Sequence, residues 1–410
     1  MGIADTADRY SKISAEEIKA LETSYLFSTY QRYELFLSHG SGAYLYDLEG
    51  RRYLDFLAGI AVNSLGYSHP RISKVLQEQG QKLIHCSNLL YNAYQGQLAK
   101  RLVELSGMAK VFFTNSGTEA IEAALKISRA FARSQGHAER SRFLCIKNSF
   151  HGRTFGALSI TAQEKYQAPF RPLLGDVTVV PELTAEALAE AFDDRVCALI
   201  LEPIQGEAGV RPLPGDFLRA AREICDHYGA LLILDEIQTG FARTGRYFAF
   251  QHYRIQPDLL TLAKAIASGY PMGAVVGSTK VGQCLKTGQH GTTYGGGPLA
   301  CRVALEALDI IEDEGLVARA AELGAYLIQG LNILKTRHGM IREVRGLGLM
   351  VGVEIGSIAP DVVKKLLRCG VVANASHGTV LRLVPPLIIT REEIDFFLKA
   401  LDEVLGEFST

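Results

Sequence analysis

A carboxylate pair at the end of an apolar run is the first candidate for chemistry in this sequence. Residues 230–240 read Ala-Leu-Leu-Ile-Leu-Asp-Glu-Ile-Gln-Thr-Gly, so Asp235 and Glu236 directly follow a run of large aliphatic residues. Such a run is typical of a strand buried on both faces of a parallel sheet, and its C-terminal end opens into the crevice where α/β folds bind ligands. A buried Asp235 would need a cationic partner. An ordinary ion pair in a loop explains the same two residues.

Lys264 is a candidate nucleophile. It lies in the mostly apolar segment Thr-Leu-Ala-Lys-Ala-Ile-Ala over residues 261–267. A desolvated lysine has a lowered pKa and offers a free amine for a Schiff base. Lysines in such settings more often extend their charged end to solvent, so the sequence alone leaves both interpretations open.

Two glycine-containing segments are suited to bind phosphate. Asn-Ser-Gly-Thr-Glu-Ala over residues 115–120 follows an apolar run and precedes a helical pattern. The free N–H groups at such a helix start attract anions, although a capping box of Ser116 and Glu119 explains the same pattern without a ligand. The second segment, residues 290–298, is rich in glycine and hydroxyl groups and suits either a phosphate or a contact between subunits.

Two further segments carry polar residues after apolar runs. Phe150-His-Gly-Arg-Thr offers an aromatic ring for stacking and Arg153 for a bidentate contact with a carboxylate, although a surface arginine is the plainer interpretation. Glu202 and Glu207 follow the run over residues 198–201, which places them at the ligand-binding edge of the predicted sheet. A structural ion pair explains either acid equally well.

The composition restricts the class of protein. The chain has 410 residues, 48% of them hydrophobic and 21% charged, which is ordinary for a soluble globular protein. A net charge of -1 argues against nucleic acid or an anionic membrane as a partner, and no apolar run reaches membrane-spanning length. The seven cysteines form no C-x-x-C pair, which argues against a disulfide framework or a metal site and fits the cytoplasm.

Seven apolar segments, mostly separated by helical patterns, predict the sheet that positions these residues. Their alternation with helices favours an α/β fold with a doubly wound, largely parallel sheet. The segments are 111–113, 143–146, 177–180, 198–201, 231–234, 259–262 and 274–277.

The two ends of the chain follow different patterns. Residues 42–55 alternate around Glu49-Gly50 as in a hairpin, and the C-terminal helix opens with a capping box of Thr390 and Glu393. The prediction is an N-terminal segment (1–72) that contributes to a small domain, a large cofactor-binding α/β domain (73–300) and a C-terminal small α+β domain (301–410).

The order of these motifs is what a pyridoxal phosphate site requires: a phosphate turn, a stacking aromatic, an acid after a buried strand and a lysine after the next strand. With them, the chain resembles the class III (ω-amino acid) aminotransferases, which are pyridoxal-phosphate enzymes of fold type I. The resemblance runs from about Tyr44 to the C-terminal helix. It rests on N-S-G-T-E-A, F-H-G-R-T, E-P-I-Q-G-E, D-E-I-Q-T-G, the A-K-A lysine and H-G-T-T-Y-G-G. The chain departs at Gly297, where many members have asparagine.

The resemblance implies roles for residues around the cofactor ring. Lys264 would bind the pyridoxal 5′-phosphate aldehyde as a Schiff base and later move the proton of the reaction. Asp235 would keep the pyridine nitrogen protonated, Gln238 would hydrogen-bond the phenolic oxygen, and Phe150 would stack on the ring.

The phosphate contacts implied by the resemblance involve two subunits. The amides of Gly117 and Thr118 would hold the phosphate, and Thr293 would reach it from the neighbouring subunit. The site would therefore require a homodimer.

The resemblance also implies how two substrates share one pocket. Arg153 would bind a carboxylate of both substrates, and Thr292 would contact the first substrate. Arg382 would be needed only for the α-carboxylate of glutamate. Our hypothesis is that Glu207 neutralises Arg382 in the other half-reaction and swings aside for glutamate.

Within the family, the pattern is most similar to members that act on N2-acetylornithine. The implied reaction transfers its δ-amino group to 2-oxoglutarate, giving N-acetylglutamate 5-semialdehyde and glutamate, as arginine biosynthesis requires. Ornithine, succinylornithine and 4-aminobutyrate are the alternative amino donors. A non-catalytic binding protein is disfavoured because both Lys264 and Asp235 are present, and a nicotinamide oxidoreductase because no G-x-G-x-x-G opens a helix after the first strand.

Overall fold

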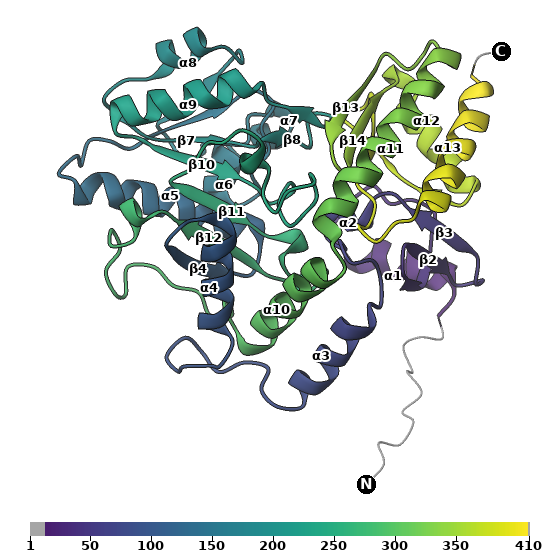
Figure 1. The fold of residues 1–410 in the computed structure, drawn as a ribbon, viewed down its shortest axis with the longest axis horizontal. Coiled ribbons are helices and arrows are strands. Elements are labelled where there is room, and N and C mark those ends of the chain that lie inside the picture. Colours follow the sequence, from purple (N-terminus) through teal and green to yellow (C-terminus); the bar gives the residue numbers. More distant parts are fainter. Residues whose placement is uncertain (1–12, 409–410) are drawn as a thin grey trace.

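The large domain is built on a seven-stranded sheet (Figure 1). The computed structural model describes residues 13–408, and all seven apolar segments predicted as strands lie in this sheet. In spatial order the strands are β4 (Lys110–Thr114), β12 (Gly273–Gly277), β11 (Leu259–Leu262), β10 (Leu231–Asp235), β7 (Val196–Leu201), β5 (Arg142–Ile146) and β6 (Val177–Val180). The sheet is parallel from β11 to β6, whereas β12 is antiparallel to both its neighbours.

Strand β10 is buried on both faces, as its unbroken apolar run predicts. Ile233 packs in the cluster that contains the inner face of α5 (Gly117–Ser134), and Leu234 packs in the opposite cluster with α9 (Gly215–Tyr228). Burying one such side chain contributes about 1.5–3 kcal/mol to stability. The strand is therefore fixed from both sides, and so is the start of the loop that begins at Asp235.

The small domain carries an antiparallel sheet of the C-terminal chain. The strand order is β13 (Glu343–Leu347), β14 (Met350–Glu354), β17 (Val380–Leu383) and β16 (Asn374–Ser376). The sheet packs with a layer of three helices, α11 (Leu316–Arg337), α12 (Ala359–Arg368) and α13 (Arg391–Gly406). The predicted capping box is confirmed: Thr390 Oγ1 accepts from the Glu393 amide at 3.2 Å, and the Glu393 carboxylate accepts from the Thr390 amide at 2.8 Å.

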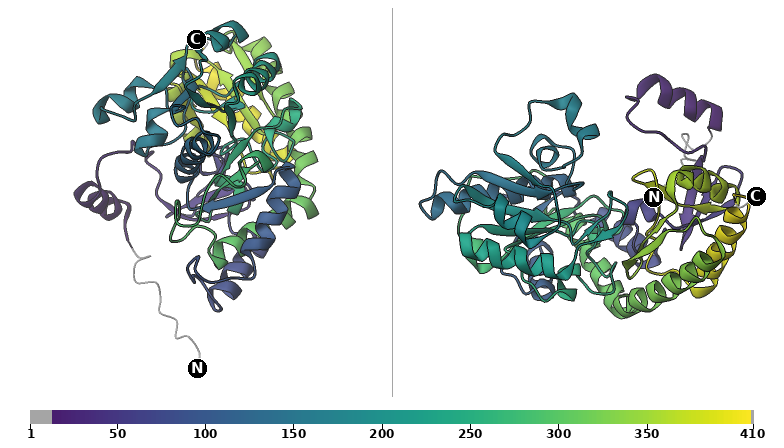
Figure 2. Two further views of the ribbon diagram at one scale, coloured as in Figure 1. Left: turned by 90° about the vertical axis from the view of Figure 1, so that its left-hand side faces the viewer. Right: turned by 90° about the horizontal axis from the view of Figure 1, so that it is seen from above.

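A third sheet joins segments from the two ends of the chain. The predicted hairpin is confirmed as β2 (Tyr44–Asp47) and β3 (Arg52–Asp55), preceded by β1 (Leu37–Ser41). Strand β3 pairs in parallel with β15 (Val371–Val372). The domain boundaries at residues 72 and 300 stay a prediction. Helix α1 (Ala15–Tyr25) has no buried residue and stands away from the rest of the chain (Figure 2).

The remaining elements connect these sheets. Helices α10 and α11 lead from the large domain to the small one (Figure 2). The other elements are α2 (Ala58–Ala61), α3 (Pro70–Gly80), α4 (Gln95–Ser106), α6 (Phe155–Ser159), α7 (Glu164–Gln167), α8 (Ala185–Ala191), α10 (Pro298–Asp313), β8 (Ile204–Gln205), β9 (Arg211–Pro212) and the short 3₁₀ turns η1 (Ala168–Phe170), η2 (Ala249–His252), η3 (Lys264–Ala267), η4 (Thr279–Val281) and η5 (Gly356–Ile358). Within residues 13–408, no helix combines the length and apolar character needed to cross a bilayer.

Candidate functional site

One cavity of about 470 Å³ collects most of the residues singled out in the sequence, and we call it the Lys264 cavity. It lies at the C-terminal ends of the parallel strands, where α/β folds bind ligands. Seven of the predicted site residues line it: Gly117, Thr118, Phe150, Arg153, Asp235, Gln238 and Lys264.

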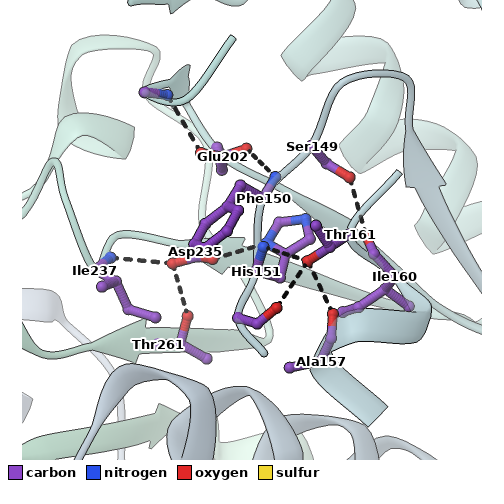
Figure 3. Close-up of polar contacts among 12 residues, drawn as sticks. Ser149, Phe150, His151, Ala157, Ile160, Thr161, Glu202, Asp235, Ile237 and Thr261 are labelled. Carbon is purple, nitrogen blue, oxygen red and sulfur yellow. Dashed lines mark hydrogen bonds and ion pairs between the residues drawn. The ribbon is translucent and has the colours of Figure 1, made fainter. Parts of the chain in front are cut away.

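Asp235 lies at the end of β10 and is 5% exposed. Its Oδ2 atom lies 2.7 Å from Nδ1 of His151, and its Oδ1 atom accepts from the Ile237 amide at 3.1 Å and the Thr261 hydroxyl at 3.3 Å (Figure 3). The sequence predicted a cationic partner for this carboxylate, and here an imidazole is in contact with it. The described residues leave His151 Nε2 buried without a hydrogen-bond partner.

Glu236 points elsewhere. Its carboxylate is buried and accepts from the Thr239 hydroxyl at 2.6 Å and from the amides of Ala249 and Phe250 at 2.8 and 2.7 Å. Burial raises the pKa of Glu236 to about 7. The interpretation of residues 235 and 236 as a loop ion pair is therefore wrong for Glu236, because its partners are a hydroxyl and two backbone amides, all uncharged. These bonds hold the loop after β10.

Glu202, at the end of β7, links two loops beside the cavity. Its carboxylate accepts from the Phe150 amide at 3.0 Å and from the Gly206 amide at 3.3 Å (Figure 3). Burial, and after it the nearby Asp235 carboxylate, raise the pKa of Glu202 well above its usual value. The loop that carries Phe150 is thereby tied to the loop that carries Glu207.

Lys264 starts the turn after β11 and lines the cavity. Its backbone φ of 48° is in the left-handed region, which is strained for a residue with a side chain. Burial lowers the pKa of Lys264 to about 8, the Arg382 guanidinium acts in the same direction, and the Glu207 and Asp235 carboxylates oppose it. The amine is therefore much more often neutral near pH 8 than that of an ordinary lysine.

The turn before α5 combines a helix cap with free amides. Ser116 Oγ accepts from the Glu119 amide at 3.3 Å, as the capping interpretation predicts, but the Glu119 carboxylate bonds the Asn115 amide at 2.7 Å. The amides of Gly117 and Thr118, in the first turn, have no acceptor within the helix. A Cβ atom on Gly117 would lie 2.8 Å from Cδ1 of Ile237, so any larger residue here would force the Ile237 side chain to shift.

Arg153 is exposed at one edge of the cavity. Its guanidinium carbon lies 3.8 Å from the ring centre of Tyr166 and 5.6 Å from that of Phe150. The surface-loop interpretation of Arg153 is thus accurate for its exposure, but its charge stands over two aromatic rings at the cavity.

Arg382 lies on β17 of the small domain and is 1% exposed. Its Nη1 atom donates to the Glu207 carboxylate, and its Nε atom donates to Asn374 Oδ1 at 3.1 Å. Burial opposes the ionisation of Glu207, but the Arg382 guanidinium more than offsets it and holds the pKa of Glu207 below its usual value. Both side chains act electrostatically on Lys264.

Thr292 and Thr293 do not line the Lys264 cavity of their own chain. They line a neighbouring depression of about 340 Å³, and only Asn115 lines both. Thr292 Oγ1 accepts from Asn115 Nδ2 at 3.2 Å, whereas Thr293 is exposed. Gly297 follows in the same loop as the N-cap of α10, which it leaves without a side-chain cap.

A family model described as "Aminotransferase class-III" matches residues 27–405. The chain belongs to this family. Its cofactor is therefore pyridoxal 5′-phosphate, and it is an aminotransferase acting on an amino acid and a 2-oxo acid.

Two relatives and two solved structures show how similar this aminotransferase is to known proteins. "Acetylornithine aminotransferase" of Caldanaerobacter subterraneus subsp. tengcongensis is 46% identical, with 94% of this chain and 98% of the relative covered. The protein of the same name from Methanocaldococcus jannaschii is 45% identical, with 96% and 99% covered. The ornithine aminotransferase from Toxoplasma gondii ME49 matches in structure with a TM-score of 0.95 at 35% identity, with 100% and 99% covered. The acetylornithine aminotransferase from Elizabethkingia anophelis matches with a TM-score of 0.86 at 33% identity, with 97% and 100% covered.

The residues of this class III aminotransferase fit its cofactor. The Oε1 atom of Gln238 is buried without a hydrogen-bond partner among the described residues, as expected of a group that meets a ligand. The free amides of Gly117 and Thr118 suit a phosphate. Asp235 offers a carboxylate for a ring nitrogen, and Lys264 offers an amine for an aldehyde. No cluster of three or more metal-ligating side chains occurs in the part of the chain that the structure describes.

Sequence reasoning missed His151, Glu202 and Tyr166 in this aminotransferase. His151 stood inside the F-H-G-R-T motif, so its place beside Phe150 after a buried strand was the available signal. Glu202 was named, with a structural ion pair as one interpretation, but its partners are the backbone amides of Phe150 and Gly206. Tyr166 lies in a short helix outside every motif, and nothing in the sequence marked it.

Proposed function

We propose that this aminotransferase transfers the δ-amino group of N2-acetylornithine to 2-oxoglutarate, giving N-acetylglutamate 5-semialdehyde and glutamate, a step of arginine biosynthesis. The observation that carries the proposal is that Lys264 and Asp235 line one cavity beside the free amides of Gly117 and Thr118. The amino donor is supported by relatives named acetylornithine aminotransferase at 46, 45 and 42% identity over nearly the whole chain.

The chemistry divides between two side chains. When bound, pyridoxal phosphate supplies an electron sink for the charge left at the substrate carbon that loses its proton. The Lys264 amine would hold the aldehyde carbon of the cofactor and, once free, would take that proton and return it. Asp235 would keep the pyridine nitrogen protonated, and His151, whose Nδ1 atom lies 2.7 Å from Asp235 Oδ2, orients the carboxylate.

Two arginines allow one pocket to accept two substrates. Arg153 binds the α-carboxylate of N2-acetylornithine and the γ-carboxylate of glutamate, with Thr292 as a further contact to bound N2-acetylornithine. Arg382 binds the α-carboxylate of glutamate alone. The Glu207–Arg382 pair supports a switch in which Glu207 neutralises the buried cation in one half-reaction and moves aside in the other.

A homodimer with shared sites is part of this proposal, with Thr293 contributed to the phosphate of the neighbouring subunit. Thr293 is exposed beside Tyr294, which is 66% exposed and whose ring lies 5.1 Å from that of His85. The adjoining segment exposes Leu89 at 91% and Leu90 at 64%, and exposed large apolar side chains close together are typical of a subunit interface.

Hybrid dimers test this arrangement. Mixing Lys264→Ala and Thr293→Val chains should restore activity, since one site of each hybrid then combines a native lysine with the partner's native threonine. No recovery in a mixture that forms dimers would contradict the shared site.

We assign the enzyme to the cytoplasm. All seven cysteines are free thiols, which suits a reducing compartment. Localisation of the tagged full chain by cell fractionation tests this assignment.

Ornithine is the second candidate donor, favoured by the close structural match to the ornithine aminotransferase of Toxoplasma gondii at a TM-score of 0.95.

The test of the proposed reaction is the visible spectrum of the full chain loaded with its cofactor. N2-acetylornithine should bleach the yellow band, and 2-oxoglutarate should restore it. A higher kcat/KM for ornithine, succinylornithine or 4-aminobutyrate would reassign the donor. Lys264→Ala should lose the yellow band, because the lysine that binds the cofactor aldehyde is then missing.

A further inference from the structure

The guanidinium of Arg153 is held by aromatic rings instead of by an acid. Within residues 13–408, no ion pair or side-chain hydrogen bond involves it, and its contacts are the rings of Tyr166 at 3.8 Å and Phe150 at 5.6 Å. The two rings meet edge to face, with centroids 5.9 Å apart and planes at 77°. They form a corner that holds the charge at the edge of the Lys264 cavity.

Helix α7, which carries Tyr166, is anchored at both its ends. The Gln163 side chain donates to the carbonyls of Asn148 and Ser149 at 3.3 and 3.2 Å. The Gln167 side chain donates to the carbonyls of Leu158 and Ser159 at 3.0 and 3.2 Å. These four carbonyls belong to the chain on either side of Arg153, so the backbone under the Tyr166 ring is held against the segment that carries the arginine.

A ring has an advantage over a carboxylate as the neighbour of a substrate-binding arginine. A cation over an aromatic face is attracted by the ring electrons, and this attraction uses none of the five N–H donors of the guanidinium. A carboxylate would occupy those donors and compete with the substrate, as Glu207 does at Arg382.

We propose that Tyr166 is a positioning residue: its ring holds Arg153 ready for the substrate carboxylate in both half-reactions. This inference rests on the proposed function, in which Arg153 binds a carboxylate of each substrate. The hydroxyl of Tyr166 plays no part in it. The face of the Tyr166 ring, with Phe150 beside it, sets the place of the Arg153 guanidinium and leaves its N–H donors free for the substrate.

The test compares Tyr166→Leu with Tyr166→Phe in the full chain loaded with its cofactor. The probe is glutarate, a five-carbon dicarboxylate without an amine, and its Kd is measured by calorimetry. Tyr166→Leu should weaken glutarate about three- to fivefold, because the ring contact is lost, whereas Tyr166→Phe should stay within about 1.5-fold of the native chain. In single-turnover kinetics, Tyr166→Leu should raise the half-saturating concentration of N2-acetylornithine and of glutamate alike. The limiting rates and the visible spectrum should change little.

Two further variants separate this inference from the proposed function. Arg153→Gln should weaken glutarate more than Tyr166→Leu does, and adding Tyr166→Leu to Arg153→Gln should cause no further loss. If Arg153→Gln binds glutarate normally, the role of Arg153 in the proposed function fails. If Arg153→Gln weakens binding but Tyr166→Leu does not, or if Tyr166→Phe is as weak as Tyr166→Leu, the positioning role of the ring is refuted.

A matched control lies on the small domain, where Arg391 stands 5.1 Å from the ring of Tyr326. Tyr326→Leu removes the same kind of contact far from the cavity and should leave glutarate binding unchanged. A loss there equal to that of Tyr166→Leu would contradict the proposal. Should Tyr166→Leu not fold, Tyr166→Gln, which has no ring face, takes its place with the same expected loss.

Discussion

The two arginines proposed to bind substrate carboxylates lie in different surroundings. Arg153, on the large domain, is exposed and stands 3.8 Å from the ring centre of Tyr166. Arg382, on the small domain, is 1% exposed and bonded to Glu207 and to Asn374. Within residues 13–408, no acceptor of the protein bonds the guanidinium of Arg153, whereas Nε and Nη1 of Arg382 both donate to side chains of the protein.

The difference follows from burial. An exposed cation is solvated, so a ring that orients it is enough, whereas a buried cation without a counter-charge would cost several kcal/mol. A substrate carboxylate that binds Arg382 would therefore have to displace Glu207, whereas one that binds Arg153 would compete with no acceptor of the described residues. We infer that Arg153 serves every substrate and that Arg382 serves only a substrate able to replace its partner.

The largest expected effect is that of Arg382→Leu. It should lower kcat/KM of the glutamate half-reaction about 10³-fold, because a buried charge pair is lost, which costs about 4 kcal/mol. The N2-acetylornithine half-reaction should lose much less, because its carboxylate is proposed to bind Arg153 instead. Single-turnover absorbance of each half-reaction measures both values. Equal losses in the two would break the distinction between the arginines.

Next in size, Arg153→Gln should lower kcat/KM of both half-reactions about 10²-fold, since each loses a charge-assisted bidentate contact. The same absorbance assay applies. A loss confined to one substrate would show that Arg153 is as selective as Arg382.

Glu207→Gln should act in opposite directions on the two half-reactions. Without Glu207 as counter-charge, Arg382 is an unpaired buried cation while N2-acetylornithine is bound, and that half-reaction should slow about tenfold. Glutamate, whose carboxylate no longer has to displace Glu207, should bind a few-fold more tightly. The measurement is the concentration dependence of each half-reaction. Unchanged behaviour in both would rule out the switch.

The pH dependence of cofactor binding tests whether the Glu207–Arg382 pair, and not Arg153, affects the pKa of Lys264. Only the neutral amine reacts, and the pKa of Lys264 is about 8, so the rate at which cofactor-free chain regains its yellow band should rise up to about pH 8 and then level off. Because the Glu207 carboxylate raises this pKa, Glu207→Gln should move the midpoint to lower pH. Arg153→Gln should leave it in place. A rate still rising above pH 10 would contradict the lowered pKa.

The smallest effect is expected for Asn374→Ala. Arg382 Nε donates to Asn374 Oδ1 at 3.1 Å, and the loss of this bond should weaken glutamate about threefold to tenfold. The affinity for N2-acetylornithine should be unchanged. A comparable loss for both substrates would mean that Asn374 supports the fold of β16 and β17 instead of the orientation of Arg382.

Much of the large domain was predictable because its central strands β7, β10, β11 and β12 are buried along their whole length. Strands buried on both faces are continuous apolar runs, and the edge strands β4 and β6, although partly exposed, are also mostly apolar, so all seven appeared in the sequence. The polar residues at the ends of the parallel strands marked the edge where the cavity lies. The antiparallel direction of β12 was not predictable, since an apolar run carries no sign of its direction. Lys264, Asp235 and Glu207 were named from their positions after such runs, whereas Arg382, and the role of Glu207 as its partner, came through the family resemblance.

Contacts between single residues depended on the tertiary structure. His151 and Asp235 are 84 positions apart, and they meet because their strands lie in one sheet with only β7 between them. Glu207 and Arg382 are 175 positions apart and lie on different domains. Tyr166 reaches Arg153 only because α7 folds back on the chain around the arginine.

The sequence by itself determined the apolar runs, the glycine turn and the order of the chemical groups along the chain, because each of these is set by neighbouring residues and their spacing. Only the tertiary structure decided which imidazole meets Asp235, which acid meets Arg382 and which ring meets Arg153. The physical reason is that burial and charge pairing depend on distances in space, and strand order and domain packing set those distances without leaving a local pattern in the sequence.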